Sequence, residues 1–264
     1  MKTKILLFGL LIGAAMVIFT CSKKDGAGSD NVVSKEIIAK FKAKGFNTEG
    51  IEKVAGQNGQ DAYLVEYCTL VTEKELDQMT DPTIVNGPFG EQYRTYNLVN
   101  KPLTIKIQGP TSPTKINTAI DQAIARYNAR NLQIKFTRVT SSPDITVKVV
   151  SGSAGGVSGF PSNGKPYPNV TIYSQTTSYS QAVVTHVVTH ELGHTIGFRH
   201  SDYFNRSLSC GVGGNEGAST VGAVLIPGTT QGFDAKSVMN SCFSTSSNGI
   251  FSSYDTIALN QLYK

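Results

Sequence analysis

The chain has 264 residues, of which 39% are hydrophobic and 16% are charged, and its formal net charge is +5. This composition is typical of a chain that buries a sizeable core, and it excludes an intrinsically disordered protein. The basic residues form no dense Lys/Arg stripe, so no nucleic-acid partner is expected. The length suits one large domain preceded by a smaller one.

The N-terminus has the pattern of an export signal. Basic residues in Met1–Lys4 precede an apolar run, Ile5–Phe19, which is shorter than the about 20 residues of a membrane-spanning helix. The run ends at Cys21 and resembles the lipobox of Bacteroidetes-type lipoproteins, whose cysteine receives lipid. We therefore expect a lipoprotein-type signal peptide over residues 1–21 and a flexible tether over 22–31.

The alternative is an ordinary cleaved signal peptide with an incidental cysteine. Both interpretations predict an exported protein. In the first, the chain is lipid-anchored to the outer membrane or cell surface of a bacterium, so that a membrane is one of its partners. In the second, it is secreted.

Residues 32–94 are predicted to form a small α/β unit. The apolar spacing in Val33–Phe46 predicts a helix with Ser34 as its N-cap. The segment Ala62–Val71 is rich in β-branched and aromatic residues and predicts one strand. Thr72–Met79 then predicts a short helix that begins with a capping box.

Residues 95–264 are predicted to form the larger domain. The apolar spacing in Ser112–Arg130 predicts a long amphipathic helix. The Gly-, Ser- and Pro-rich segment Ser151–Pro168 predicts a loop. Predicted strands cover Leu103–Gln108, Leu132–Val139, Asp144–Val150 and Val170–Tyr173.

The four histidines of the chain all lie in one short window, and Thr189–His200 contains the pattern H-E-x-x-H-x-x-G-x-x-H. His190 and His194 are four residues apart, so both can present an imidazole to one ion from the same helix face. Gly197 permits a positive φ, which ends the helix and turns His200 towards that ion. Three neutral ligands leave a position for water, which is typical of a catalytic zinc site.

Two further residues of this window need separate interpretations. Glu191 follows the first ligand, which places a carboxylate beside the metal as a general base. A helix whose histidines are ordinary core residues would explain neither Glu191 nor Gly197. His186 lies one turn before His190 and is either a fourth ligand or a residue that packs beside the site. We favour packing, because a fourth ligand would occupy the position needed by water.

The motif resembles that of the metzincin clan of zinc endopeptidases, which also have a methionine-containing turn downstream. Here Ser237–Ser241 reads S-V-M-N-S and lies in the range usual for the clan. Together with Ile226–Thr229 and Tyr254–Asp255, the pattern is most similar to the bacterial dual-action HEIGH metallopeptidases. The resemblance covers residues 95–264 and, more faintly, Val33–Leu76.

The sequence departs from these patterns at two positions. Leu192 stands where the family name has isoleucine, which is a harmless exchange on a helix. Ser241 stands two residues after the turn methionine, where astacin-like and serralysin-like members have tyrosine. No tyrosine zinc ligand is therefore expected.

The resemblance implies an α+β fold. The zincin/metzincin-like catalytic domain would comprise a twisted mixed sheet, a long backing helix, the active-site helix, the Met-turn with Met239 as an apolar floor, and a C-terminal helix. A small α/β pro-region would precede it. The implied protein is a monomeric zinc endopeptidase made as a zymogen, which cleaves proteins or peptides. The alternative is a surface-anchored binding or adhesion protein whose metalloprotease domain is idle, although such a protein has no reason to retain Glu191.

The remaining cysteines divide into a pair and a single residue. Cys210 and Cys242 bracket a Gly-rich loop and the Met-turn, so they are a candidate disulfide in an oxidising compartment, with a contribution of about 3–4 kcal/mol. Cys68 has no evident partner. It is a candidate latency ligand that would fill the open zinc position, but we favour the alternative of a buried strand residue.

Overall fold

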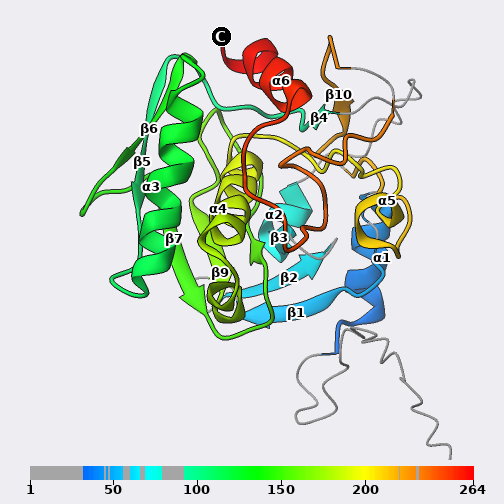
Figure 1. The fold of residues 1–264 in the computed structure, drawn as a ribbon. Coiled ribbons are helices and arrows are strands. Elements are labelled where there is room, and N and C mark those ends of the chain that lie inside the picture. Colours follow the sequence, from blue (N-terminus) through cyan, green and yellow to red (C-terminus); the bar gives the residue numbers. More distant parts are fainter. Residues whose placement is uncertain are drawn as a thin grey trace, which may run out of the picture. The chain divides into compact units, whose positions relative to one another are not determined.

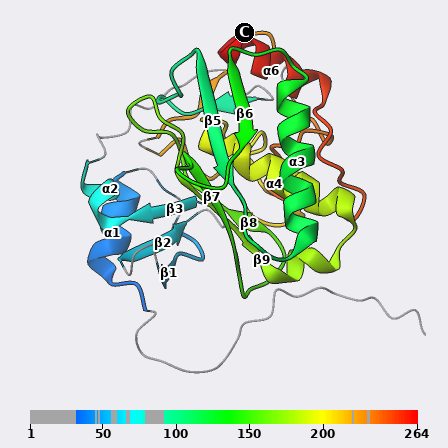
Figure 2. The same ribbon diagram turned by 90° about the vertical axis from the view of Figure 1, so that its left-hand side faces the viewer.

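The computed structural model describes residues 32–44, 46, 48–55, 60–65, 69–78, 92–219, 221–229 and 232–264. The signal peptide, the tether, Cys21 and Cys68 lie outside these residues. Within them the α+β class predicted from the sequence is confirmed. The buried hydrophobic residues form two separate cores, one before residue 79 and one after residue 92. Figures 1 and 2 draw the first of these two parts of the chain from blue to cyan and the second from green to red. None of the described helices has the length and apolar character needed to span a membrane.

The N-terminal unit is a three-stranded antiparallel sheet with two helices. Its elements are α1 (Lys35–Ala43), β1 (Glu52–Ala55), β2 (Asp61–Val65), β3 (Thr69–Thr72) and α2 (Glu73–Gln78), and the strand order is β1-β2-β3. Ser34 caps α1 by accepting a hydrogen bond from the backbone N–H of Ile37, as the sequence predicts. Thr72 and Glu75 form the predicted reciprocal cap of α2.

The prediction of one strand over Ala62–Val71 is wrong. The segment instead contributes to two paired strands, with Leu64 opposite Leu70, so the chain reverses between β2 and β3. Strand-forming residues continue through the reversal, and composition alone therefore does not reveal it. The strand β1 was also not predicted.

The C-terminal unit is built on a five-stranded sheet with the order β6-β5-β7-β9-β8. Four strands are parallel, and β8 pairs antiparallel to β9 at the edge. This gives the mixed sheet that the resemblance implied. The strands are β5 (Leu103–Gln108), β6 (Ile134–Arg138), β7 (Ile145–Val150), β8 (Gly156–Val157) and β9 (Asn169–Tyr173).

The helices α3 (Thr114–Asn128) and α4 (Gln181–Thr195) pack on each other and on the sheet (Figure 2). The remaining elements are β4 (Tyr93–Arg94), the 3-10 helix η2 (Ser174–Ser178), α5 (Ser207–Cys210), β10 (Val224–Leu225) and α6 (Ser253–Tyr263). The strand β8 lies in the segment that the sequence predicted to be a loop. Two residues are too few for the alternation that identifies a strand.

The segment before the expected boundary at residue 95 belongs structurally to the C-terminal unit. The strand β4 pairs with β10, and Arg94 also forms a β-bridge with Phe198 just after α4. Gln92 is fully buried and donates hydrogen bonds to Ser237 and Asp255. The metallopeptidase fold therefore begins no later than Gln92.

One buried carboxylate connects the C-terminal helix to the Met-turn. Asp255 accepts hydrogen bonds from the Gln92 amide and the Ser237 hydroxyl, at 2.9 and 2.7 Å. Its other oxygen accepts from the backbone N–H groups of Val238 and Ser252, both at 2.9 Å. Four donors thus converge on a single side chain that also caps α6.

We predict that Asp255→Asn lowers the free energy of unfolding by about 2–4 kcal/mol, because an amide cannot accept all four hydrogen bonds and leaves buried donors unpaired. Urea denaturation of the full chain measures this change. The matched control is Asp121→Asn, whose carboxylate is exposed and contacts only Arg138 among the described residues; its effect should stay within about 0.5 kcal/mol. Equal stability of the two variants would contradict the connecting role of Asp255.

Candidate metal centre

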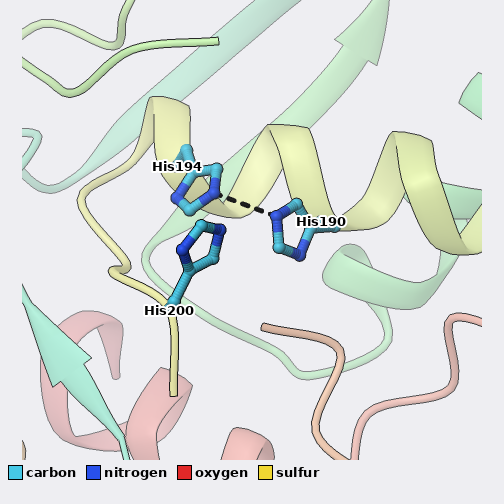
Figure 3. Close-up of side chains that lie close together, drawn as sticks. All are labelled: His190, His194 and His200. Carbon is cyan, nitrogen blue, oxygen red and sulfur yellow. Dashed lines mark hydrogen bonds between the residues drawn. The ribbon is translucent and has the colours of Figure 1, made fainter. Parts of the chain in front are cut away.

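Three histidines converge on one point in the interior of the C-terminal unit. His190 and His194 lie one turn apart on α4, and His200 follows the end of that helix (Figure 3). Potential ligand atoms of all three lie within 4.8 Å of one another, and all three side chains are buried. The Nε2 atoms of His190 and His194 are only 3.0 Å apart.

The other ring nitrogen of each histidine is held by a separate acceptor. The Nδ1 atom of His190 lies 2.8 Å from the Val238 carbonyl oxygen, and that of His194 lies 2.8 Å from the Phe198 carbonyl oxygen. A carbonyl only accepts, so each Nδ1 carries the hydrogen and each Nε2 presents a lone pair. Burial lowers the pKa of all three imidazoles and favours their neutral form.

This arrangement fits a zinc ion. Two Nε2 lone pairs that face each other at 3.0 Å repel unless a cation lies between them. Three neutral imidazole nitrogens that point at a common centre are the donor set of a catalytic zinc site. The residues that would hold the ion are therefore His190, His194 and His200.

Two glycines of the motif permit this geometry. Gly197 has φ +111°, as the sequence predicts, and the chain turns there after α4 ends. Gly193 lies inside the helix, where a Cβ atom would come within 2.5 Å of the Met239 Sδ atom. The missing side chain lets the Met-turn lie directly against the helix that carries two of the histidines. The carbonyl group of Met239 also accepts a hydrogen bond from the N–H of Ser201.

The Glu191 side chain extends from α4 to the edge strand β8. Its Oε2 atom accepts a hydrogen bond of 2.7 Å from the Ser158 hydroxyl. A Cβ atom on Gly156 would come within 2.7 Å of the Glu191 side chain, so glycine is required for this close approach. Burial raises the pKa of Glu191 to about 8, and the hydrogen bond from Ser158 acts against this rise. Sequence reasoning missed Ser158 and Gly156.

A buried carboxylate that the motif does not include supports the third histidine. The Nδ1 atom of His200 donates to Glu216 Oε1 at 2.7 Å. The same carboxylate lies 2.9 Å from Arg206 Nε and 3.6 Å from Arg199 Nη2. Burial raises the pKa of Glu216, and the two guanidinium groups oppose that rise. Because Glu216 lies in a Gly-rich loop with no motif spacing of its own, only the three-dimensional structure identifies it.

A disulfide connects this loop to the segment after the Met-turn. The structure joins Cys210 and Cys242, with an S–S distance of 2.11 Å. Next to it, the N–H of Cys242 donates to the Ser209 hydroxyl. The candidate pair from the sequence is thus bonded, and it closes the loop that contains Glu216.

His186 lies outside the group of three ligands. It is 6% exposed and lines a cavity beside the site, and its ring is stacked near that of His190 with centroids 6.4 Å apart. Burial lowers the pKa of His186 to about 3, so the ring is neutral. Packing beside the site, the interpretation favoured from the sequence, matches this position.

A mixed sheet with a backing helix, a His-rich helix and a Met-turn defines a zinc metalloendopeptidase. The chain belongs to the family described as Dual-action HEIGH metallo-peptidase, which matches residues 64–263. The family resemblance, the enzyme class and the zinc cofactor predicted from the sequence are confirmed. The alternative of an idle binding protein has no support. No curated protein matches the sequence.

Solved structures similar to this chain include two of myroilysin. The first is 17% identical, has a TM-score of 0.47, and covers 65% of this chain and 98% of its own. The second is 18% identical and has a TM-score of 0.42. The match covers 64% of this chain and 86% of the myroilysin chain. A third is high choriolytic enzyme 1, a hatching-enzyme zinc protease from the medaka fish Oryzias latipes. It is 15% identical and has a TM-score of 0.36. The match covers 62% of this chain and 93% of the hatching enzyme's chain.

We predict that Glu216→Gln weakens zinc binding by about tenfold, because the neutral amide holds the His200 imidazole less firmly than the carboxylate does. A competition titration with a chromophoric chelator measures the zinc affinity. The control is Asp121→Asn, which makes the same kind of exchange at an exposed carboxylate on α3 that pairs with Arg138 and with no histidine among the described residues. If Glu216→Gln binds zinc no more weakly than the control does, the positioning role of Glu216 is wrong.

Proposed function

We propose that the protein is an exported zinc-dependent endopeptidase in which Glu191 is the general base. The observation that carries this proposal is the convergence of three imidazole Nε2 atoms in the interior, with a buried carboxylate on the residue after the first histidine. The substrates are proteins or peptides, as the peptidase family implies.

Zinc bound by the three histidines would polarise the peptide carbonyl group and make water a better nucleophile. The protein must supply the proton transfers. The carboxylate of Glu191 accepts the proton of the attacking water and returns it to the amine that leaves. Burial raises the pKa of the Glu191 carboxyl group, which makes its carboxylate a stronger base than that of an exposed glutamate. The Ser158 hydroxyl fixes one carboxylate oxygen and so orients the other.

We predict that Glu191→Gln retains zinc but loses at least about a hundredfold in the rate of cleavage of denatured protein, the scale of a missing general base. A recognition site for a specific protease, introduced within residues 79–91, lets the pro-region be removed identically from each protein. Zinc content is measured by elemental analysis. Asp121→Asn, at an exposed position of α3 that stays in the chain after the cut, is the control and should cleave as the parent does. A Glu191→Gln protein that cleaves as fast as this control would refute the mechanism.

The proposal includes latency caused by the N-terminal unit. The backbone N–H of Leu70 on β3 donates a 3.1 Å hydrogen bond to the carbonyl oxygen of Ser158. Ser158 directly follows the edge strand β8, and its hydroxyl contacts Glu191. Substrates bind to many proteins by adding a strand to a free sheet edge. The strand β3 contacts this edge beside the general base, so its removal would make the edge accessible to substrate.

We predict that the full chain cleaves at least about tenfold more slowly than the chain cut within residues 79–91, because the cut chain can release β3 from the sheet edge. The comparison of Cys68→Ala with the parent then separates two devices. If β3 causes latency by covering the sheet edge, Cys68→Ala and the parent should be equally latent, and thiol-modifying mercurials should not activate the parent. Faster self-activation of Cys68→Ala would instead assign Cys68 to zinc, and full activity of the uncut parent would remove latency altogether.

The export part of the proposal rests on the apolar run that ends at Cys21. We predict that metabolic labelling with a palmitate analogue tags the parent but not Cys21→Ser, because only the thiol accepts lipid. The bound label is read on a gel after membrane fractionation. The control is Cys68→Ser, which should be labelled as the parent is. An unlabelled parent, recovered soluble with a different N-terminus, would remove the anchor.

A further inference from the structure

One short segment separates two cavities, of which one borders the zinc-binding helix at His186. This segment, residues 248–251, is called the wall segment here. The site cavity has a volume of about 540 Å³ and lies beside the zinc-binding helix, where its lining includes His186, Asn240 and Lys236. The arginine cavity has a volume of about 270 Å³ and lies between the wall segment and the end of α3. Ile250 and Phe251 line both cavities.

Polar and apolar residues line the site cavity in similar measure, and one exposed lysine gives it positive charge. Lys236 is the one charged residue among its described lining residues, and its ammonium group has no ion pair with a described residue. The neutral His186 ring also faces this cavity without a hydrogen-bond partner among the described residues. Six serines add hydroxyl groups: Ser209, Ser237, Ser244, Ser246, Ser247 and Ser252. A volume of this size accommodates a side chain of a bound polypeptide.

The arginine cavity contains two guanidinium groups, one from the last turn of α3 and one from the residue after its C-cap. Arg126 Nη1 and Arg130 Nε are buried and have no hydrogen-bond partner in the described part of the chain. The remaining lining residues, Ala125, Ala129, Ile250 and Phe251, are apolar. Burial lowers the pKa of Arg126, which reflects the cost of removing this cation from water without a partner. A carboxylate from outside would satisfy both groups.

The two cavities are close enough to act on one ligand. Gly249 has φ +71°, and a Cβ atom there would lie 2.5 Å from Arg126 Nη1 and 2.8 Å from the His186 Cα atom. At this residue, therefore, a single glycine separates the arginine from the helix that lines the site cavity. The described lining residues of both cavities include no aspartate or glutamate.

We propose that these two cavities bind an acidic segment of the substrate, so that the enzyme selects polypeptides with carboxylate side chains near the scissile bond. This proposal rests on the proposed endopeptidase function. The first carboxylate enters the site cavity, where Lys236 supplies the charge and His186 donates its ring N–H. A carboxylate further along the substrate pairs with Arg126 and Arg130. Lysine and arginine side chains are repelled at both positions.

The test uses peptides that differ in one residue, with Glu, Gln or Lys at each of the three positions on either side of the scissile bond. The chain is assayed after removal of its pro-region. At one or more of these positions, the Glu peptide should have a kcat/KM about tenfold higher than the Gln peptide, which corresponds to about 1.4 kcal/mol. The Lys peptide should have a lower kcat/KM than the Gln peptide. Added salt should reduce the preference, because it screens the attraction between opposite charges.

The variants assign the preference to the two cavities. Lys236→Gln should reduce the Glu/Gln ratio at the position nearest the bond to about threefold or less, and Arg130→Gln should do so at a more distant position. Lys135→Gln removes an exposed cation from β6 and should leave every ratio and rate unchanged. Cleavage of the Gln peptides tests the proposed function by itself. Their cleavage without any preference for Glu, or an unchanged preference in both cavity variants, would overturn the acidic-segment proposal alone.

Discussion

The metal centre depends on one electrostatic constraint, which is that three imidazole lone pairs must face a common point inside the protein. The three lone pairs repel one another, so the imidazole rings do not adopt this arrangement unless other groups hold them in it. In this protein, an acceptor at the Nδ1 atom of each ring fixes the ring's orientation. A carbonyl of the Met-turn holds His190, a carbonyl after α4 holds His194, and the carboxylate of Glu216 holds His200. The Met-turn and the loop that contains Glu216 therefore both serve the orientation of the ligands.

The same requirement explains why glycine occurs inside regular elements near the site. Gly193 in α4 lets Met239 approach the helix, and Gly156 in β8 lets Glu191 approach the sheet edge. Glycine within a helix costs about 1 kcal/mol relative to alanine. That cost is offset by the close packing of the Met-turn, the helix and the edge strand, which fixes the Glu191 carboxylate relative to the three histidines.

The sequence predicted the ligands and the turn at Gly197 because their spacing is local, and a helix or a glycine turn converts local spacing directly into geometry. It could not predict Glu216 or Ser158. Both reach the site through long-range contacts that leave no periodic signal. The β2–β3 reversal and the edge strand β8 were missed for a related reason, since strand pairing is decided by partners elsewhere in the chain.

Because a disulfide fixes the loop that contains Glu216, the assembly of the metal site depends on the redox state of the surroundings. It fixes the loop between Ser207 and Glu216 to the chain after the Met-turn, and that loop supplies the group behind His200. In a reducing compartment the thiols stay separate, and the loop keeps more of its conformational entropy. The third ligand is then held less firmly than it is under oxidising conditions. Formation of the Cys210–Cys242 bond therefore makes the rigidity of the zinc site depend on the redox state of its surroundings.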